Sequence, residues 1–94
     1  MIFVSHCLDK PGSLSTRQAN LSAHREHLGS AAVKILVAGP LVADDGETPI
    51  GSLFIVEAKN RAEIEAFHAG DPLRTAGVWG EVRIDQFLKR VDVR

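Results

Sequence analysis

The chain of 94 residues has no tyrosine and only one tryptophan, one methionine and one cysteine. A single cysteine, Cys7, excludes a disulfide within the chain. No apolar run approaches the roughly 20 residues that cross a bilayer, and no basic segment followed by an apolar leader opens the sequence. We therefore expect a cytoplasmic protein with no membrane partner.

An excess of charge of one sign is also missing. Eleven basic and twelve acidic side chains leave a formal net charge of -1. Binding to nucleic acid regardless of sequence needs a basic face that displaces counterions. An RNA-recognition module needs several aromatic residues beside basic ones on its central strands, and residues 53–56 (LFIV) offer one aromatic and no basic residue. We therefore expect no nucleic-acid partner.

The remaining composition is that of an ordinary globular domain, with 45% apolar and 24% charged residues. The length predicts a single domain over residues 1–94. A domain of this size buries only a modest part of its unfolded surface. It therefore needs an efficient core or a partner that shares one.

Apolar periodicity predicts four strands and two helices in the order βαββαβ. The strands are expected at 1–8, 33–38, 51–58 and 79–88, and the helices at 13–29 and 61–68, with a helical turn from Asp71 to Ala76. This order predicts an α+β fold, a ferredoxin-like sandwich with one antiparallel four-stranded sheet. Right-handed crossovers place the first and third strands in its centre.

One face of such a sheet is left without helices. The first strand is apolar on both sides, with Ile2, Val4 and Leu8 on one side and Phe3 and Cys7 on the other. We expect Phe3, Cys7 and half of the third strand to form an exposed apolar face. Because a patch of that kind usually marks an interface, we expect a homodimer that packs through the open sheet face.

Two polar residues accompany the apolar stripe of the first helix. Leu14, Leu21 and Leu28 recur every seven residues, and Arg17 and His24 share the neighbouring offset. A polar group buried without a partner costs about 1–3 kcal/mol. These side chains are therefore either hydrogen-bonded structural groups or members of a solvent-accessible site. The spacing is compatible with both interpretations.

Asp71 has two interpretations of the same kind. Asp71-Pro72 is a common helix start, in which the aspartate caps the helix and proline occupies the first position, where no N–H is needed. A carboxylate that caps a helix with one oxygen can still offer the other to a histidine.

The chain resembles a known family through an ordered set of features rather than a single motif. This set comprises Leu8-Asp9-Lys10, Arg17, His24 with Leu28 and Gly29, Ala38-Gly39-Pro40-Leu41, Gly51-Ser52, Phe67 before Asp71-Pro72, and Ala76-Gly77-Val78. By this set the chain resembles the YciI-like family, small proteins of the dimeric α/β-barrel type related in fold to muconolactone isomerase. The resemblance implies a paired histidine and aspartate at an active site, carried onto His24 and Asp71, and a basic family position at Arg17. Some members are associated with elimination of chloride from chlorinated hydroquinone-type compounds, which implies proton transfer on small ring compounds.

Such a pair has a clear chemical use. A carboxylate that accepts from one imidazole nitrogen fixes the tautomer, and the other nitrogen can then transfer a proton. Our hypothesis makes His24 the general acid or base and Asp71 its orienting partner. Arg17 attracts an anionic or phenolic ligand, and Ser52 lines the same cavity.

The function predicted in this way is isomerisation or elimination on a small-molecule ring compound, without a cofactor. The alternative is a non-catalytic small-ligand-binding or accessory dimer, in which the pair is structural or holds an anion. We expect no metal, because His24 and His27 lie three residues apart but no second group of ligands accompanies them.

Three other side chains are less informative. We expect Cys7 to be a small buried apolar residue rather than a nucleophile. His6 is expected to be a hydrogen-bonded core histidine, and His68 to face solvent near a helix end.

Overall fold

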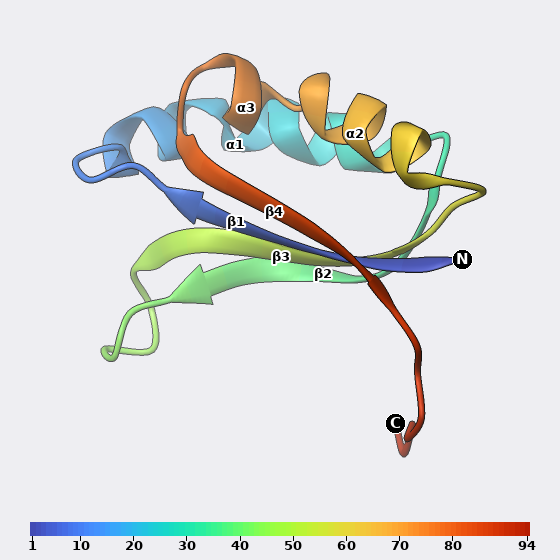
Figure 1. The fold of residues 1–94 in the computed structure, drawn as a ribbon. Helices are drawn as coiled ribbons and strands as arrows, with labels where there is room; N and C mark the ends of the chain where they lie inside the picture. Colours follow the sequence, from blue (N-terminus) through green and yellow to red (C-terminus); the bar gives the residue numbers. More distant parts are fainter.

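Four antiparallel strands form one sheet, and three helices cover the same side of it (Figure 1). The computed structural model describes residues 1–94. The elements are β1 (Ile2–Asp9), α1 (Leu14–Gly29), β2 (Lys34–Val42), β3 (Pro49–Glu57), α2 (Arg61–Ala69), α3 (Pro72–Thr75) and β4 (Trp79–Phe87). The spatial order is β2-β3-β1-β4. The predicted ferredoxin-like α+β fold is therefore confirmed, with β1 and β3 in the centre of the sheet.

The strands β2 and β3 are longer than the sequence predicted. We expected β2 to end at Ala38, before Gly39-Pro40, but it continues to Val42 and pairs Pro40 with Ser52 of β3. Proline lacks an N–H and is tolerated in a strand only at an edge or a bulge. Because β2 is an edge strand, Pro40 does not interrupt the sheet.

Side chains and glycines mark the element ends. Asn60 caps α2 by accepting a hydrogen bond from the Glu63 amide, and Asp71 caps α3 by accepting one from the Leu73 amide. Ser13 precedes α1 but makes no side-chain cap, because its hydroxyl instead donates to the Lys10 carbonyl at 2.6 Å. None of the helices is long and apolar enough to span a membrane.

The two faces of β1 are the reverse of our prediction. Phe3 and Cys7 point toward the helices and are buried, together with Ser5. The side that carries Ile2 and Val4 faces away from the helices. Alternation predicts that two sets of residues face opposite sides, but both sets here are largely apolar, so the pattern could not say which one meets the helices.

The core lies between the helices and β1, β3 and β4. Its members are all apolar: Phe3, Cys7, Phe54, Val56, Ala58, Ile64, Phe67, Leu73, Val78, Trp79 and Ile84. None of these residues comes from α1, whose buried members are instead Arg17 and His24. The leucine stripe of α1 is therefore only partly buried: Leu28 packs against the core, but the helix leaves space between itself and the sheet.

Candidate active site

His24 and Asp71 form a buried pair between α1 and the start of α3. The Nδ1 atom of His24 lies 2.8 Å from each carboxylate oxygen of Asp71. The Asp71 side chain is fully buried and that of His24 is 9% exposed. Since a carboxylate can only accept, Nδ1 carries the hydrogen and donates it to Asp71.

Asp71 has two structural tasks at once. Its Oδ1 atom also accepts the amide hydrogen of Leu73 at 2.9 Å, which caps α3. Pro72 follows as the first helical residue. The cap and the histidine bond together hold the carboxylate in one orientation, so both interpretations of Asp71-Pro72 describe the same residue.

The second nitrogen of His24 is left available. Nε2 has no hydrogen-bond partner, yet it is not among the fully enclosed unpartnered atoms of the protein. The rings of Phe54 and Trp79 meet the imidazole edge-on, with centroids 6.3 Å and 6.5 Å away. The imidazole is therefore fixed on one side by a carboxylate and on two others by aromatic rings.

Arg17 is held by a second buried acid. Its Nη1 atom donates to both oxygens of Asp9 at 2.9 Å and 3.0 Å, and Nη2 donates to the Ser52 hydroxyl oxygen at 2.9 Å. The two side chains of the ion pair are 4% and 7% exposed. Asp9 therefore balances the charge of Arg17, and the role of Arg17 in attracting an anionic or phenolic ligand stays a prediction.

The Ser52 hydroxyl gains a defined direction from this contact. Its oxygen accepts from Arg17, so its hydrogen remains to be donated. Ser52 stands on the helix side of β3, two residues before Phe54.

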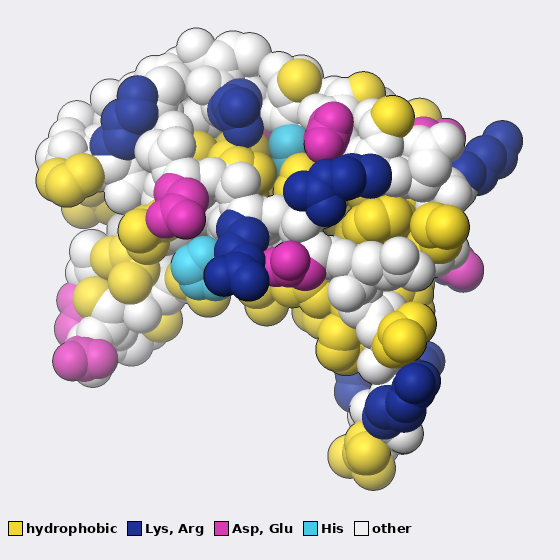
Figure 2. Space-filling model, viewed as in Figure 1, with side chains coloured by type: hydrophobic (Ala, Val, Ile, Leu, Met, Phe, Trp, Pro, Cys, Tyr) yellow, Lys and Arg dark blue, Asp and Glu magenta, His cyan; other side chains and the backbone are white.

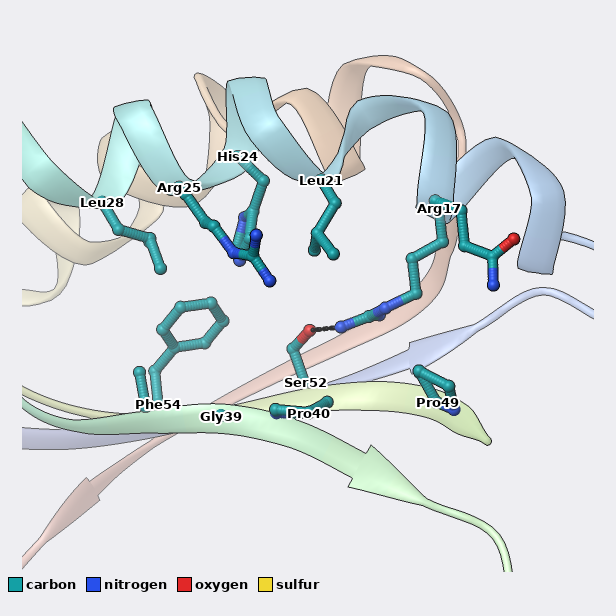
Figure 3. A pocket seen from close by; sticks show the side chains of 12 residues that line it. Arg17, Leu21, His24, Arg25, Leu28, Gly39, Pro40, Pro49, Ser52 and Phe54 are labelled. Carbon is teal, nitrogen blue, oxygen red and sulfur yellow. Dashed lines mark hydrogen bonds between the residues drawn. The ribbon is translucent and has the colours of Figure 1, made fainter. Parts of the chain in front are cut away.

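A pocket of about 230 Å³ lies between α1 and the strands β2 and β3 (Figure 3). Figure 3 shows Arg17, Leu21, His24, Arg25 and Leu28 reaching down from α1 toward the sheet. The lining consists of Arg17, Gln18, Leu21, His24, Arg25, Leu28, Ala38, Gly39, Pro40, Pro49, Ser52 and Phe54. The pocket therefore joins an apolar floor with a few polar groups, the usual make-up of a small-ligand site.

The four site residues proposed from the sequence fall into two adjoining groups. His24, Arg17 and Ser52 line the pocket, while Asp71 lies behind His24 and does not. Sequence reasoning missed Asp9, whose signal was present only as part of the Leu8-Asp9-Lys10 segment. The partner of Arg17 became visible only when α1 was folded against the end of β1.

Another buried polar contact lies beside Phe54, whose ring centroid is 4.9 Å from that of His68. His68 is 1% exposed, and its Nε2 atom lies 2.7 Å from the Ser5 hydroxyl. The prediction that His68 faces solvent is wrong, because α2 turns this side chain under itself onto β1. The pKa of His68 is lowered from 6.5 to about 4, chiefly by burial; Asp71 opposes this change, and Arg74 and His27 contribute to it.

The other histidines and the cysteine have simpler environments. His6 is exposed on the open side of the sheet, so the prediction of a core histidine is wrong. The reason is that the face of β1 that carries His6 points away from the helices. His27 donates from Nε2 to the Phe67 carbonyl at 2.7 Å. Cys7 is fully buried in the core, which confirms the predicted packing residue. The pKa of its thiol is raised to about 12, chiefly by burial and also by the charge of Asp71, so the thiol stays protonated.

A cluster suited to a metal does not occur in the chain. No group of three or more histidine, cysteine, aspartate and glutamate side chains is arranged to hold an ion. The Nδ1 atom of His24 in particular is hydrogen-bonded to Asp71 and is therefore not available to a metal ion.

Comparisons with known proteins give one family and several related structures. The family model of the YCII-related domain matches residues 1–88. The 5-chloro-2-hydroxyhydroquinone dehydrochlorinase TftG from Burkholderia phenoliruptrix, solved in complex with 2,5-dihydroxybenzoquinone, is 32% identical over 94% of each chain with a TM-score of 0.82. No curated protein sequence matches the chain.

Two more distant structures share the fold alone. An antibiotic biosynthesis monooxygenase is 14% identical, covers 98% of this chain and 100% of its own, and has a TM-score of 0.57. The protein PA3566 from Pseudomonas aeruginosa is 16% identical, covers 96% and 93%, and has a TM-score of 0.56. At these identities the likeness describes the backbone and not the chemistry.

Proposed function

This chain belongs to the family of YCII-related domains, and on that basis we propose that it is an enzyme of acid–base chemistry on small ring compounds, with His24 as the proton-transferring group. One observation carries the proposal. The Nδ1 atom of His24 is bound to a buried carboxylate, while Nε2 stays unpartnered beside a pocket of about 230 Å³. A general base needs this combination of a fixed ring and a free nitrogen.

In the proposed reaction Nε2 removes a proton from a hydroxyl or an activated C–H of the ligand. The imidazolium that forms is stabilised by the Asp71 carboxylate, which lies 2.8 Å from Nδ1. In an isomerisation the same proton returns to a different atom of the ring compound. In an elimination the electron pair left behind forms a new double bond, and an anionic leaving group departs.

The opposite end of the pocket suits the oxygen on which negative charge then develops. The Ser52 hydroxyl, which accepts from Arg17 at 2.9 Å, can donate its hydrogen to such an oxygen. The cation behind it strengthens that donor, since hydrogen bonds polarise one another along a chain. Arg17 therefore acts through Ser52 as well as by lining the pocket itself, and Asp9 positions it.

The dehydrochlorinase supports a ring compound as the ligand. Its structure contains 2,5-dihydroxybenzoquinone, a six-membered ring with oxygen substituents. Here Phe54 of the sheet and Leu21 and Leu28 of α1 give the pocket apolar walls on opposite sides, which suits a flat ring, while His24 and Ser52 stand where oxygen substituents can reach them. Elimination on a hydroquinone-type compound and isomerisation of a ring ketone both need a base and an oxygen-binding donor on the same ring. His24 and Ser52 would fill these two roles.

The test combines kinetics with the state of the histidine ring. With chlorinated hydroxyhydroquinones as substrates, we expect His24→Gln to lower kcat by about two to four orders of magnitude, the usual contribution of a general acid or base. We expect Asp71→Asn, whose amide oxygen can still cap α3, to reduce kcat while leaving the protein folded. Nitrogen NMR on the wild type should show hydrogen on Nδ1 of His24, and this preference should weaken in Asp71→Asn.

The matched control is His27→Gln, because His27 lies one turn from His24 but bonds the Phe67 carbonyl. It should retain wild-type kcat. Turnover that survives in His24→Gln would contradict the proposal. Ring compounds that bind without being converted would favour the alternative, a non-catalytic ligand-binding dimer.

We also propose that the chain forms a homodimer through the open face of its sheet. Apolar side chains lie along the lower side of the molecule, between the β2–β3 hairpin and the C-terminal segment (Figure 2). On this face Leu8 and Val37 are 42% and 40% exposed, beside the half-buried Val4 and Ile55, which pair in the centre of the sheet. A second copy would remove this apolar surface from water, which is the main favourable contribution to most associations.

A further inference from the structure

We propose that Arg25 selects ring compounds that carry a carboxylate, by binding that group where its side chain enters the pocket beside His24. This inference rests on the proposed function, because it uses the same pocket. It adds a class of substrate, an aromatic or quinonoid acid, to the chemistry assigned to His24.

The pocket lining contains cations but no acidic residue. Among its twelve residues there is no aspartate or glutamate, and the cations are Arg17, Arg25 and, when protonated, His24. Arg17 is balanced by Asp9, and His24 has Asp71 behind it. Arg25 takes part in no ion pair of the protein, so its positive charge is the one left for a ligand.

The position of Arg25 on α1 brings its side chain to the pocket. In Figure 3 its side chain extends from the helix toward β2 and β3 and lies beside His24. Arg25 and Arg17 are eight residues apart, about 12 Å along a helix axis. The two arginines therefore leave α1 at different places along the pocket, with His24 and Leu21 between them on the helix.

A guanidinium group is well suited to bind a carboxylate. Its planar donors match the two oxygens of a carboxylate, and such charge-assisted bonds are stronger than neutral ones. A flat ring on Phe54 can place a hydroxyl near Ser52, an exchangeable proton near Nε2 of His24 and a carboxylate near Arg25. A neutral ring would leave the guanidinium with water alone.

Isothermal titration calorimetry with two compounds tests this inference. The probes are 2,5-dihydroxybenzoate and hydroquinone, which share the ring and its two hydroxyl groups and differ by the carboxylate. We expect the wild type to bind the acid about tenfold or more tightly than hydroquinone, a ratio typical of a hydrogen bond to a charged group. In Arg25→Gln the ratio should fall to about one through weaker binding of the acid, with hydroquinone unchanged.

Three further variants separate this inference from the proposed function. Arg25→Lys should keep part of the preference, because the charge remains. Arg61→Gln is the matched control, because Arg61 is an exposed arginine of α2 outside this pocket, and it should behave as the wild type. His24→Gln should lose turnover but keep the preference for the acid.

Each contrary outcome has a distinct meaning. A preference for the acid that persists in Arg25→Gln, or a wild type with no preference, overturns the role of Arg25 and leaves the chemistry of His24 intact. Failure of both compounds to bind the wild type at millimolar concentration overturns this inference and the proposed ring-compound function together. Raising the salt concentration should reduce the preference, since Arg25 is exposed and its attraction is screened.

Discussion

Polar side chains are buried beside the apolar core. The buried set is Ser5, Arg17, His24, Ser52, His68 and Asp71. Their bonds divide them into three contacts: Arg17 with Ser52 and Asp9, His24 with Asp71, and His68 with Ser5. Each contact satisfies groups that would otherwise lower stability when removed from water.

His68 differs from the other buried histidine in lacking an acid on its second nitrogen. Its Nδ1 atom has no hydrogen-bond partner, and burial lowers its pKa to about 4. The folded protein therefore holds His68 neutral over a range in which the unfolded chain binds a proton. This residue should make stability depend on pH.

The sign of this dependence follows from proton linkage. Because the unfolded chain takes up the proton near pH 6.5 and the folded protein only near pH 4, stability falls as pH drops from 6.5 toward 4. We expect His68 to account for about 2 kcal/mol of lost stability between pH 7.5 and 5. Urea denaturation at the two pH values measures it.

A matched pair of variants isolates this contribution. His68→Gln cannot be protonated, so its stability should change less between the two pH values than that of the wild type. His6→Gln replaces an exposed histidine and should keep the wild-type difference. Equal pH dependence in His68→Gln and the wild type would contradict the assignment.

Among the elements, α1 and β3 determine the site by the distance between them. α1 presents Arg17, His24 and Arg25 to the sheet, and β3 meets them with Ser52 and Phe54. Close packing of α1 on the sheet would fill the pocket. The arginine and histidine on its inner face prevent this, because they need partners at the ends of β1 and α3.

Gly51 holds β3 close to β1 just before Ser52. A Cβ atom at Gly51 would overlap the carbonyl oxygen of Cys7 in the neighbouring strand. We therefore expect Gly51→Ala to lower the free energy of unfolding by about 1–3 kcal/mol, the usual cost of overpacking. Because Ser52 follows directly, ring compounds should also bind more weakly.

Gly39 provides the control on the neighbouring strand. It also lies within a paired strand, but a Cβ atom there meets nothing within 4 Å. Gly39→Ala should therefore leave the urea midpoint at or slightly above that of the wild type. If the two alanine variants were equally stable, close approach of β1 and β3 would not be the reason for the glycine.

For the whole molecule, the two sides of the sheet have separate tasks. The helix side contains the core and the pocket, and the open side carries apolar residues together with His6, Arg83 and Asp85 near β4. Dimerisation through the open side would leave the layer between the helices and the sheet intact.

This assembly gives a test by analytical ultracentrifugation. We expect Val4→Glu, on the open side of the central strand β1, to weaken the dimer about a hundredfold or more, because a carboxylate would be buried in an apolar interface. Ala23→Glu adds the same charge on the exposed side of α1 and should remain dimeric. A wild type that sediments as a monomer at micromolar concentration would rule the dimer out.

The sequence by itself determined the α+β class, the order of the strands and the family. Alternation and helical periodicity depend on local geometry, and the turn residues of Asp71-Pro72 and Gly77 mark boundaries in the same local way. The pairing of His24 with Asp71 was also predicted, but from the family resemblance and not from spacing. Its catalytic role stays a prediction.

Only the tertiary structure decided which polar groups meet and which face is covered. Phe3 and Cys7 face the helices, and the His68 side chain is buried. Asp9 forms the ion pair that balances the charge of Arg17. The physical reason is that these outcomes depend on how far each helix stands from the sheet and on which side it lies. That distance and that side result from the packing of all elements together, and no local pattern along the chain contains them.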